Sequence, residues 1–167
     1  MRVLINIGQG SRWHSSYATN VLLSPKYLKV YAAYDLMQQL TWIQFNWAVE
    51  TITASYAFHS FSGIYGVPRG GVCLAVALSH SLALPWLTEP KQGCLVVDDV
   101  YETGQTLSFI REQVDATFVV WMSKLPQEWW NAAITVSPDE WLVFPWENVD
   151  LAEEDEARYR ASRSMTP

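Results

Sequence analysis

The sequence predicts an α/β fold: an open, twisted, mainly parallel sheet with helices on both faces. Apolar runs too short for helices alternate along the chain with segments of helical spacing, as in strands joined by crossover helices. Two of these apolar runs end in loops of small and charged residues, at 68–71 and 98–106. Open α/β sheets bind ligands at the carboxyl ends of their strands, so we expect a ligand site at this edge.

Length and composition limit the class of protein. The 167 residues are 50% hydrophobic and 14% aromatic, which predicts one folded domain and excludes disorder over most of the chain. No apolar run reaches the roughly 18 residues of a membrane span, and the first residues lack a signal-peptide core. We therefore expect a soluble cytoplasmic protein with no membrane partner. The net charge of -6 argues against a nucleic-acid partner, which needs a basic face.

The first 60 residues contain one clear element. Residues 1–40 are not assigned, because their short apolar runs fit either strands or helix starts. Thr41 and Gln44 then form a capping-box pattern, and apolar residues recur after them at helical spacing. We expect a helix at 41–54.

The rest of the chain alternates between strands and helices. A buried strand at 60–67 precedes a helix that begins after Gly71, and a short strand at 84–87 follows it. Further strands are expected at 94–97, 118–122 and 141–144, with a helix resuming at Leu107. From residue 151 the chain turns acidic and then basic, which leaves a frayed terminal helix or a tail as alternatives.

The stretch 94–107 carries the strongest chemical signal. Its apolar run ends in two adjacent carboxylates, Asp98 and Asp99, and a turn of sequence Glu-Thr-Gly-Gln-Thr at 102–106 leads into the helix. Unpaired amides and the dipole at a helix N-terminus favour a phosphate group. Helix capping accounts poorly for two adjacent acids at the end of an apolar strand. We therefore predict that this edge faces a phosphorylated substrate.

Three segments together resemble one family. Residues 94–107 resemble the phosphoribosyl-pyrophosphate (PRPP) signature of type I phosphoribosyltransferases: hydrophobic residues, two acids, a further acid, then Thr-Gly-x-Thr. Residues 66–71 are similar to the pyrophosphate loop of that family, and residues 141–147 resemble the base-binding segment of its xanthine-guanine and hypoxanthine members. The resemblance implies the fold of that family, with a small hood formed by the N- and C-terminal segments.

The resemblance also implies a division of the single domain, 1–167. Residues 1–40 would be an atypical N-terminal segment and 41–124 the PRPP-binding core. Residues 125–150 would form the base-binding hood, and 151–167 a charged tail.

The resemblance implies roles for the PRPP-binding residues. Asp98 and Asp99 would be catalytic, on the ribose hydroxyls and magnesium, and Glu102 would handle a proton near N7 of the purine. The 5′-phosphate would lie on Thr103, Gly104, Gln105 and Thr106, and the pyrophosphate on Arg69, Gly70 and Gly71. A strained or cis peptide bond is expected before Arg69. Helix capping remains the alternative for the acids, and a surface turn for Arg69.

The resemblance assigns the base to a second group of residues. Lys124 would donate to the six-position oxygen of the purine, Trp141 would stack on the ring, and the Leu142 carbonyl would contact its edge. Glu147 would act on magnesium or pyrophosphate through water. A solvated lysine in a turn is the alternative for Lys124. For Trp141, one of nine tryptophans, the alternative is a core or surface position.

The sequence departs from the family at two places. Glu102 stands where the family usually has Asp, and residues 84–93 leave almost no room for the long loop that closes over the substrate. Three explanations stay open for the missing lid: a substitute from the first 40 residues, with Arg12, His14 and Tyr17; a neighbouring subunit; or PRPP binding without efficient transfer.

The sequence thus supports two functions. The first is a magnesium-dependent transferase that moves the 5-phosphoribosyl group from PRPP to guanine, xanthine or hypoxanthine and releases pyrophosphate. The resemblance also implies a homodimer. The alternative is a PRPP- or nucleotide-binding regulatory or vestigial protein on the same fold.

Overall fold

The computed structural model describes residues 37–164. Five strands form the main sheet in the order β3-β2-β4-β5-β6, and every neighbouring pair is parallel. The bounds of the strands are Ile64–Gly66 (β2), Trp86–Leu87 (β3), Leu95–Tyr101 (β4), Thr117–Ser123 (β5) and Asn131–Thr135 (β6). The predicted open parallel sheet is therefore confirmed.

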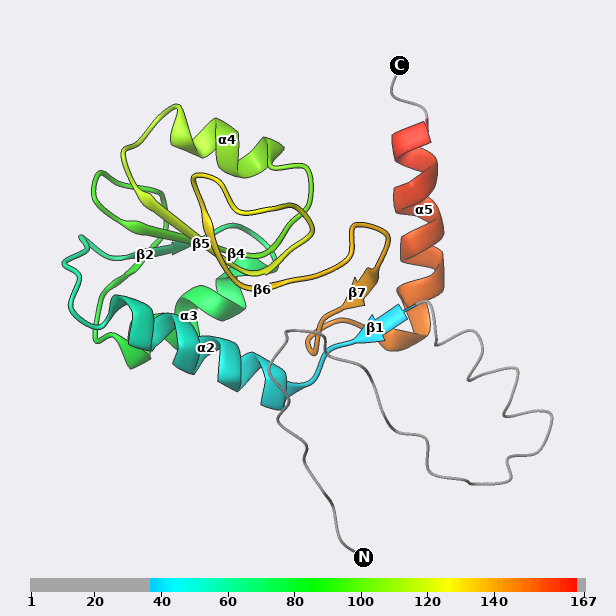
Figure 1. The fold of residues 1–167 in the computed structure, drawn as a ribbon, viewed down its shortest axis with the longest axis horizontal. Coiled ribbons are helices and arrows are strands. Elements are labelled where there is room, and N and C mark those ends of the chain that lie inside the picture. The colour runs from blue at the N-terminus through cyan, green and yellow to red at the C-terminus, as the bar shows by residue number, and fades with distance from the viewer. Residues whose placement is uncertain (1–36, 165–167) are drawn as a thin grey trace, which may run out of the picture.

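Helices cover both faces of this sheet (Figure 1). Helices α2 (Trp42–Tyr56) and α3 (Gly71–Ser81) lie on one face, and α4 (Gln105–Arg111) lies on the other. Successive side chains along a strand accordingly point to opposite faces of the sheet. On β4, Leu95 and Val97 pack with α2 and α3, whereas Val96 packs with residues of α4.

The capping box predicted for α2 is present. The Thr41 backbone amide donates to Oε1 of Gln44 at 2.8 Å, and the Gln44 amide donates to the Thr41 hydroxyl at 3.3 Å. The expected helix is confirmed and runs two residues further than predicted, to Tyr56.

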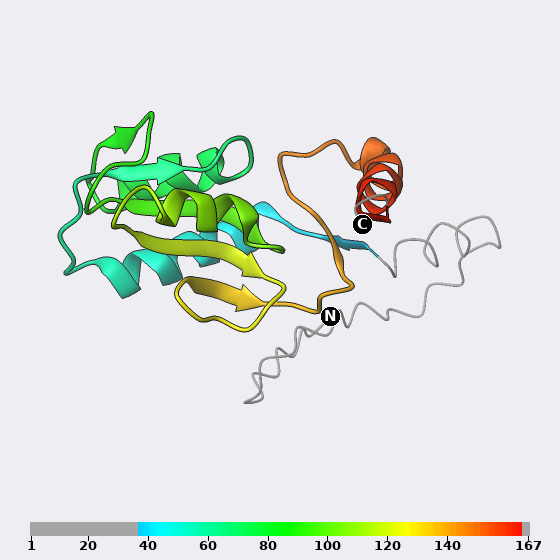
Figure 2. The ribbon, with the colours of Figure 1, turned by 90° about the horizontal axis from the view of Figure 1, so that it is seen from above.

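A smaller unit lies beside the main sheet (Figures 1 and 2). Strand β1 (Met37–Gln39) pairs in parallel with β7 (Trp141–Val143), so the start of the described chain meets a segment about 100 residues further on. A 3-10 turn, Val149–Leu151, then leads into α5 (Ala152–Ser164). Of the two alternatives for the C-terminal segment, the structure therefore shows the helix.

Several predicted boundaries need correction. The strand expected at 60–67 is confined to Ile64–Gly66, and β4 continues four residues beyond the predicted 94–97. Strands β1 and β6 were not predicted. Because β6 pairs with β5, residues 131–135 belong to the main sheet. The apolar run at residues 3–5 and the N-terminal lid option lie outside the described residues.

Candidate active site

The candidate site lies at the carboxyl edge of the main sheet, where the end of β4 meets the loop that follows β2. Gly66 pairs with Val97, and the Val67 amide donates to the Val97 carbonyl at 2.9 Å. The register therefore brings residues 68–71 beside Asp98 and Asp99. Both acids lie within β4 and not in the loop after it, so neither is a helix cap.

The glycines of the first loop lie against the two acids. A Cβ on Gly70 would stand 1.5 Å from Oδ2 of Asp99, and a Cβ on Gly71 would stand 3.0 Å from Oδ1 of Asp98. The Gly71 amide also hydrogen-bonds to the Asp98 carboxyl group. Gly70 is therefore required by close approach to the acid, and the two predicted sequence segments form one contiguous surface.

Burial disfavours the ionised forms of the two acids. Burial, together with the adjacent Asp99 carboxylate, raises the pKa of Asp98 to about 8. Burial also raises the pKa of Asp99. Two carboxylates this close oppose each other's ionisation, so a bound cation or hydroxyl donors would favour the charged forms. The pair is suited to a ligand that brings either of these.

Arg69 occupies the exposed tip of the first loop, between Pro68 and Gly70. The peptide bond Pro68-Arg69 is cis, as predicted. Arg69 also lowers the pKa of Glu147, against the larger opposing effect of burial. The loop therefore presents a cation near the acidic edge of the site.

The second loop, residues 102–106, leads into α4 in a conformation that requires glycine at one position. Gly104 has a φ of +72°, and a Cβ there would stand 2.0 Å from the Tyr101 hydroxyl. Chain geometry alone therefore accounts for Gly104, so the presence of this glycine is not evidence for a phosphate cradle. Thr103, Gln105 and Thr106 surround it, and the Gln105 amide donates to the Thr103 hydroxyl at 3.5 Å.

Glu102 and Lys124 form an ion pair at this edge. Nζ of Lys124 lies 2.5 Å from Oε1 of Glu102, and the lysine is only 6% exposed. The Lys124 amide donates to the Tyr101 carbonyl, which extends the ladder between β4 and β5. The alternative of a solvated lysine in a turn is therefore wrong. Lys124 is buried and paired with a carboxylate.

Two aromatic side chains flank this ion pair. Nζ of Lys124 lies 5.9 Å from the centroid of the Trp141 ring, and the ring of Tyr159 lies 5.5 Å from Trp141. The Tyr159 hydroxyl donates to Oε2 of Glu102. Tyr159 was not predicted, because it lies 57 residues from Glu102 in a segment whose sequence pattern is one of charges.

Leu142 lies within β7, and Glu147 lies in the turn that follows this strand. Leu142 is buried in the core that α2 and α3 share with the sheet. Glu147 turns back to accept a hydrogen bond from the Phe144 amide at 2.8 Å, and burial raises its pKa. Glu147 thus braces the turn after β7, within electrostatic reach of Asp99 and Arg69.

The protein alone offers a magnesium ion few ligands. Among residues 37–164, no three His, Cys, Asp or Glu side chains form a group that could hold a metal. The Asp98 and Asp99 pair fits the commoner magnesium arrangement, in which one or two carboxylates bind together with substrate phosphates. The donor set therefore fits an ion that arrives with a phosphorylated ligand.

The connection from β3 to β4 is short, as the sequence predicted. It comprises only residues 88–94, and the Cys94 amide donates to the Lys91 carbonyl within it. This connection contains no long loop that could fold over the carboxyl edge of the sheet.

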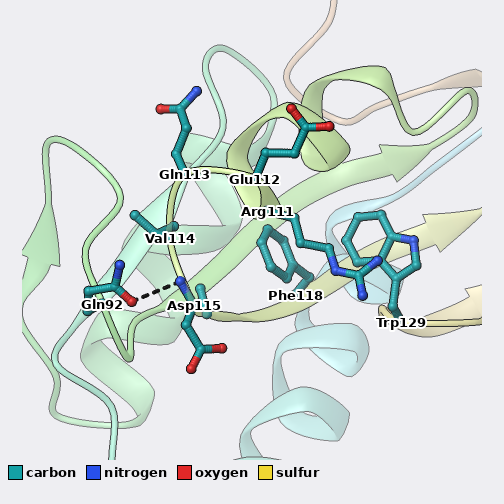
Figure 3. A pocket seen from close by; sticks show the side chains of 9 residues that line it. Gln92, Arg111, Glu112, Gln113, Val114, Asp115, Phe118 and Trp129 are labelled. Atoms are coloured by element: carbon teal, nitrogen blue, oxygen red, sulfur yellow. Dashed lines mark hydrogen bonds between the residues drawn. The ribbon is translucent and has the colours of Figure 1, made fainter.

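A separate hollow of about 450 Å³ lies away from these residues (Figure 3). Gln92 and Asp115, which line it, precede β4 and β5, so it opens at the amino edge of the sheet. The Arg111 guanidinium lies over the Trp129 ring at 4.7 Å. This hollow contains none of the residues predicted for the active site.

The described chain also has no helix that is both long and apolar enough to span a lipid bilayer.

Comparisons with known proteins find phosphoribosyltransferases among the proteins similar to this chain. No family model matches the chain. The xanthine-guanine phosphoribosyltransferase of Idiomarina loihiensis is 29% identical over 115 residues, which cover 52% of this chain and 71% of that protein. The matched 52% of this chain is about 87 residues. About 28 of the 115 aligned positions are therefore gaps in the sequence of this chain. The matched stretch is therefore shorter in this chain than in that relative.

Solved structures show the same fold. A purine phosphoribosyltransferase from Pyrococcus horikoshii has a TM-score of 0.58 at 24% identity, over 67% of this chain and 95% of that one. The xanthine-guanine-hypoxanthine phosphoribosyltransferase of Helicobacter pylori has a TM-score of 0.55 at 18% identity, over 72% and 97%. A hypothetical protein of Neisseria gonorrhoeae with bound ppGpp has a TM-score of 0.53 at 17% identity, over 75% and 98%.

Proposed function

From the premise that this chain has the type I phosphoribosyltransferase fold and resembles its purine branch, we propose that it is a purine phosphoribosyltransferase. It transfers the 5-phosphoribosyl group of PRPP to guanine, xanthine or hypoxanthine and releases pyrophosphate, a purine-salvage reaction. The proposal rests most directly on one observation: the Gly70–Asp99 contact, which joins the loop carrying Arg69 to the acid pair of β4.

The PRPP would span these two loops. Arg69 supplies a cation for the pyrophosphate, and residues 103–106 supply amides and hydroxyls for the 5′-phosphate. Asp98 and Asp99 would accept hydrogen bonds from the ribose hydroxyls, because ionised carboxylates are acceptors only. Their negative charge favours the positive charge that develops on the ribose as pyrophosphate leaves.

The base would lie between Trp141 and the Glu102–Lys124 pair. The new bond joins a ring nitrogen of the purine to C1′ of the ribose, while the bond from C1′ to pyrophosphate breaks and its electrons leave with the pyrophosphate. Glu102 would take the proton that the base loses. Lys124 would donate to the six-position oxygen, which guanine, xanthine and hypoxanthine share, and the Leu142 carbonyl would contact the edge of the base.

Asp98 or Asp99 would hold magnesium together with the phosphates of PRPP, and the ion would supply neutralisation of the phosphate charge there. Glu147, already held by the Phe144 amide, would reach such an ion only through water. A homodimer, a cytoplasmic location and the division at residues 41, 125 and 151 belong to the same proposal, and they rest on the resemblance alone.

The shortened β3–β4 connection favours a second candidate: a protein that binds PRPP or a nucleotide without efficient transfer. Closure over a substrate excludes water and strengthens the electrostatic interactions within the site, so a missing lid should lower the rate or permit hydrolysis.

Pyrophosphate release separates the two candidates. Wild-type protein would be incubated with magnesium, PRPP and each of the three bases in turn. The enzyme predicts release that depends on the base. The binding protein predicts that PRPP raises the melting temperature while no base stimulates release.

A further inference from the structure

The Glu102 carboxylate is held at both of its oxygens by residues from different parts of the fold. Lys124, at the end of β5, contacts Oε1 at 2.5 Å, and the Tyr159 hydroxyl of α5 donates to Oε2. The Glu102 side chain is 22% exposed, whereas that of Lys124 is 7% exposed. The carboxylate thus lies at the edge of solvent while its two partners fix its direction.

We infer that Tyr159 is a positioning residue that fixes the Glu102 carboxylate for proton transfer. The inference rests on the function proposed above. Glutamate has one more rotatable bond than aspartate, so more side-chain freedom must be lost before its carboxylate points in one direction. Lys124 holds one oxygen only, and the carboxylate could still rotate about that contact. The Tyr159 hydroxyl removes this remaining freedom.

Tyr159 is itself well placed for this role. Its ring packs beside Trp141 at 5.5 Å between centroids, tilted by 52°. The contact with Trp141 fixes the position of the Tyr159 ring, and this directs the hydroxyl toward Glu102. α5 therefore contributes the Tyr159 side chain to the site, although the sequence of the helix is dominated by charge.

The Glu102 carboxylate keeps hydrogen-bonding capacity beyond these two contacts. An ionised carboxylate has about four lone-pair positions, and Lys124 and Tyr159 take one oxygen each. A base can therefore donate a hydrogen bond to Glu102 while both partners keep theirs. This property distinguishes a positioning residue from a plug, which the substrate would have to displace.

The variant Tyr159→Phe tests the inference because it keeps the ring and removes only the hydroxyl. A hydrogen bond to a charged group contributes about 1.5–3 kcal/mol, so kcat should fall by about tenfold or more. KM for PRPP should stay unchanged, since the contacts of Tyr159 described above are with Glu102 and Trp141, outside residues 68–71. Tyr56→Phe is the matched control. It removes a hydroxyl that accepts from Asn131 at 2.8 Å outside the site, and it should leave kcat unchanged.

A second variant tests whether Tyr159 acts through Glu102. Glu102→Asp withdraws the carboxylate from the Tyr159 hydroxyl, so adding Tyr159→Phe to it should lower kcat by less than threefold further. An equal loss in both backgrounds would overturn the inference, as would an unchanged kcat in Tyr159→Phe alone. If Tyr159→Phe lowers KM for the base and leaves kcat undiminished, Tyr159 is a residue that the base must displace, and the inference is overturned as well. If wild-type protein forms no nucleotide, the proposed function fails and this inference fails with it; the other three outcomes reject the inference alone.

Discussion

Oδ2 of Asp99 lies where a side chain on Gly70 would begin, because a Cβ there would stand only 1.5 Å from that oxygen. Gly70 has ordinary helical backbone angles, with φ of -63°. The cost of a substitution is therefore steric and not conformational. Gly70→Ala must move either the loop or the carboxylate, and PRPP affinity should fall by about tenfold or more, as seen by calorimetry.

A second substitution checks this explanation. Asp99→Ala removes the atoms that the new methyl group meets, so Gly70→Ala should lower the melting temperature clearly in wild-type protein and little in the Asp99→Ala background. Equal losses in the two backgrounds would show that Gly70 is needed for another reason.

Asp99→Asn should lower kcat by about 100-fold or more without destabilising the fold. Burial raises the pKa of Asp99, so its charge opposes folding, and the neutral amide relieves that cost. The amide oxygen can still accept from the Val100 amide, as Oδ1 does at 2.8 Å. Steady-state kinetics and a melting curve measure the two effects. A large fall in melting temperature would mean that the acid is structural.

Arg69→Ala should raise KM for PRPP by about tenfold or more, because the proposal makes Arg69 the cation of the pyrophosphate loop. Arg69→Lys keeps the charge but loses the fork geometry of the guanidinium, so it should be intermediate. Arg111→Ala is the control, since Arg111 lies over Trp129 at the opposite edge of the sheet. Equal effects of Arg69→Ala and Arg111→Ala on KM would contradict this placement.

The stability of the ligand-free protein should fall between about pH 4 and pH 8 on account of Asp98. Its pKa is about 8 in the fold, against 3.8 for the ordinary group, so the folded state retains a proton that the unfolded chain releases. Folding then becomes less favourable as the pH rises, by at most about 1.4 kcal/mol per pH unit, and the effect ends above pH 8.

Asp98→Asn tests this contribution. Urea unfolding at several pH values should show that wild-type stability decreases relative to the variant between pH 5 and pH 8. The variant also removes the coupling of Asp98 to Asp99, so the difference between the two profiles reports on the pair. Parallel pH profiles would contradict the assignment to Asp98.

Local patterns were sufficient to predict most elements of the main sheet. The Thr41–Gln44 capping box gave the start of α2 correctly, because the signal lies within four residues. The Pro-Arg-Gly-Gly loop and the acid pair were identified separately in the sequence. Their mutual contact follows from the parallel register of β2 and β4, which places the ends of neighbouring strands side by side.

The features that were missed depend on distant contacts. Strand β6 reads Asn-Ala-Ala-Ile-Thr, a sequence with weak strand propensity that is fixed by pairing with β5. Tyr159 is a single aromatic residue in a charged helix, and its hydrogen bond to Glu102 spans 57 positions. Lys124 was predicted to bind the base, with a solvated turn residue as the alternative, but its burial and its pairing with Glu102 were not predicted. No periodicity within a short window contains this information.

Nucleotide formation tests the central claim most directly. Wild-type protein would be incubated with PRPP, magnesium and guanine, xanthine or hypoxanthine, and the products separated by chromatography. The account predicts a nucleoside 5′-monophosphate formed in equal amount to pyrophosphate with at least one base, and its loss in Asp99→Asn. Protection of the protein by PRPP against heat, with no nucleotide from any of the three bases, would contradict it.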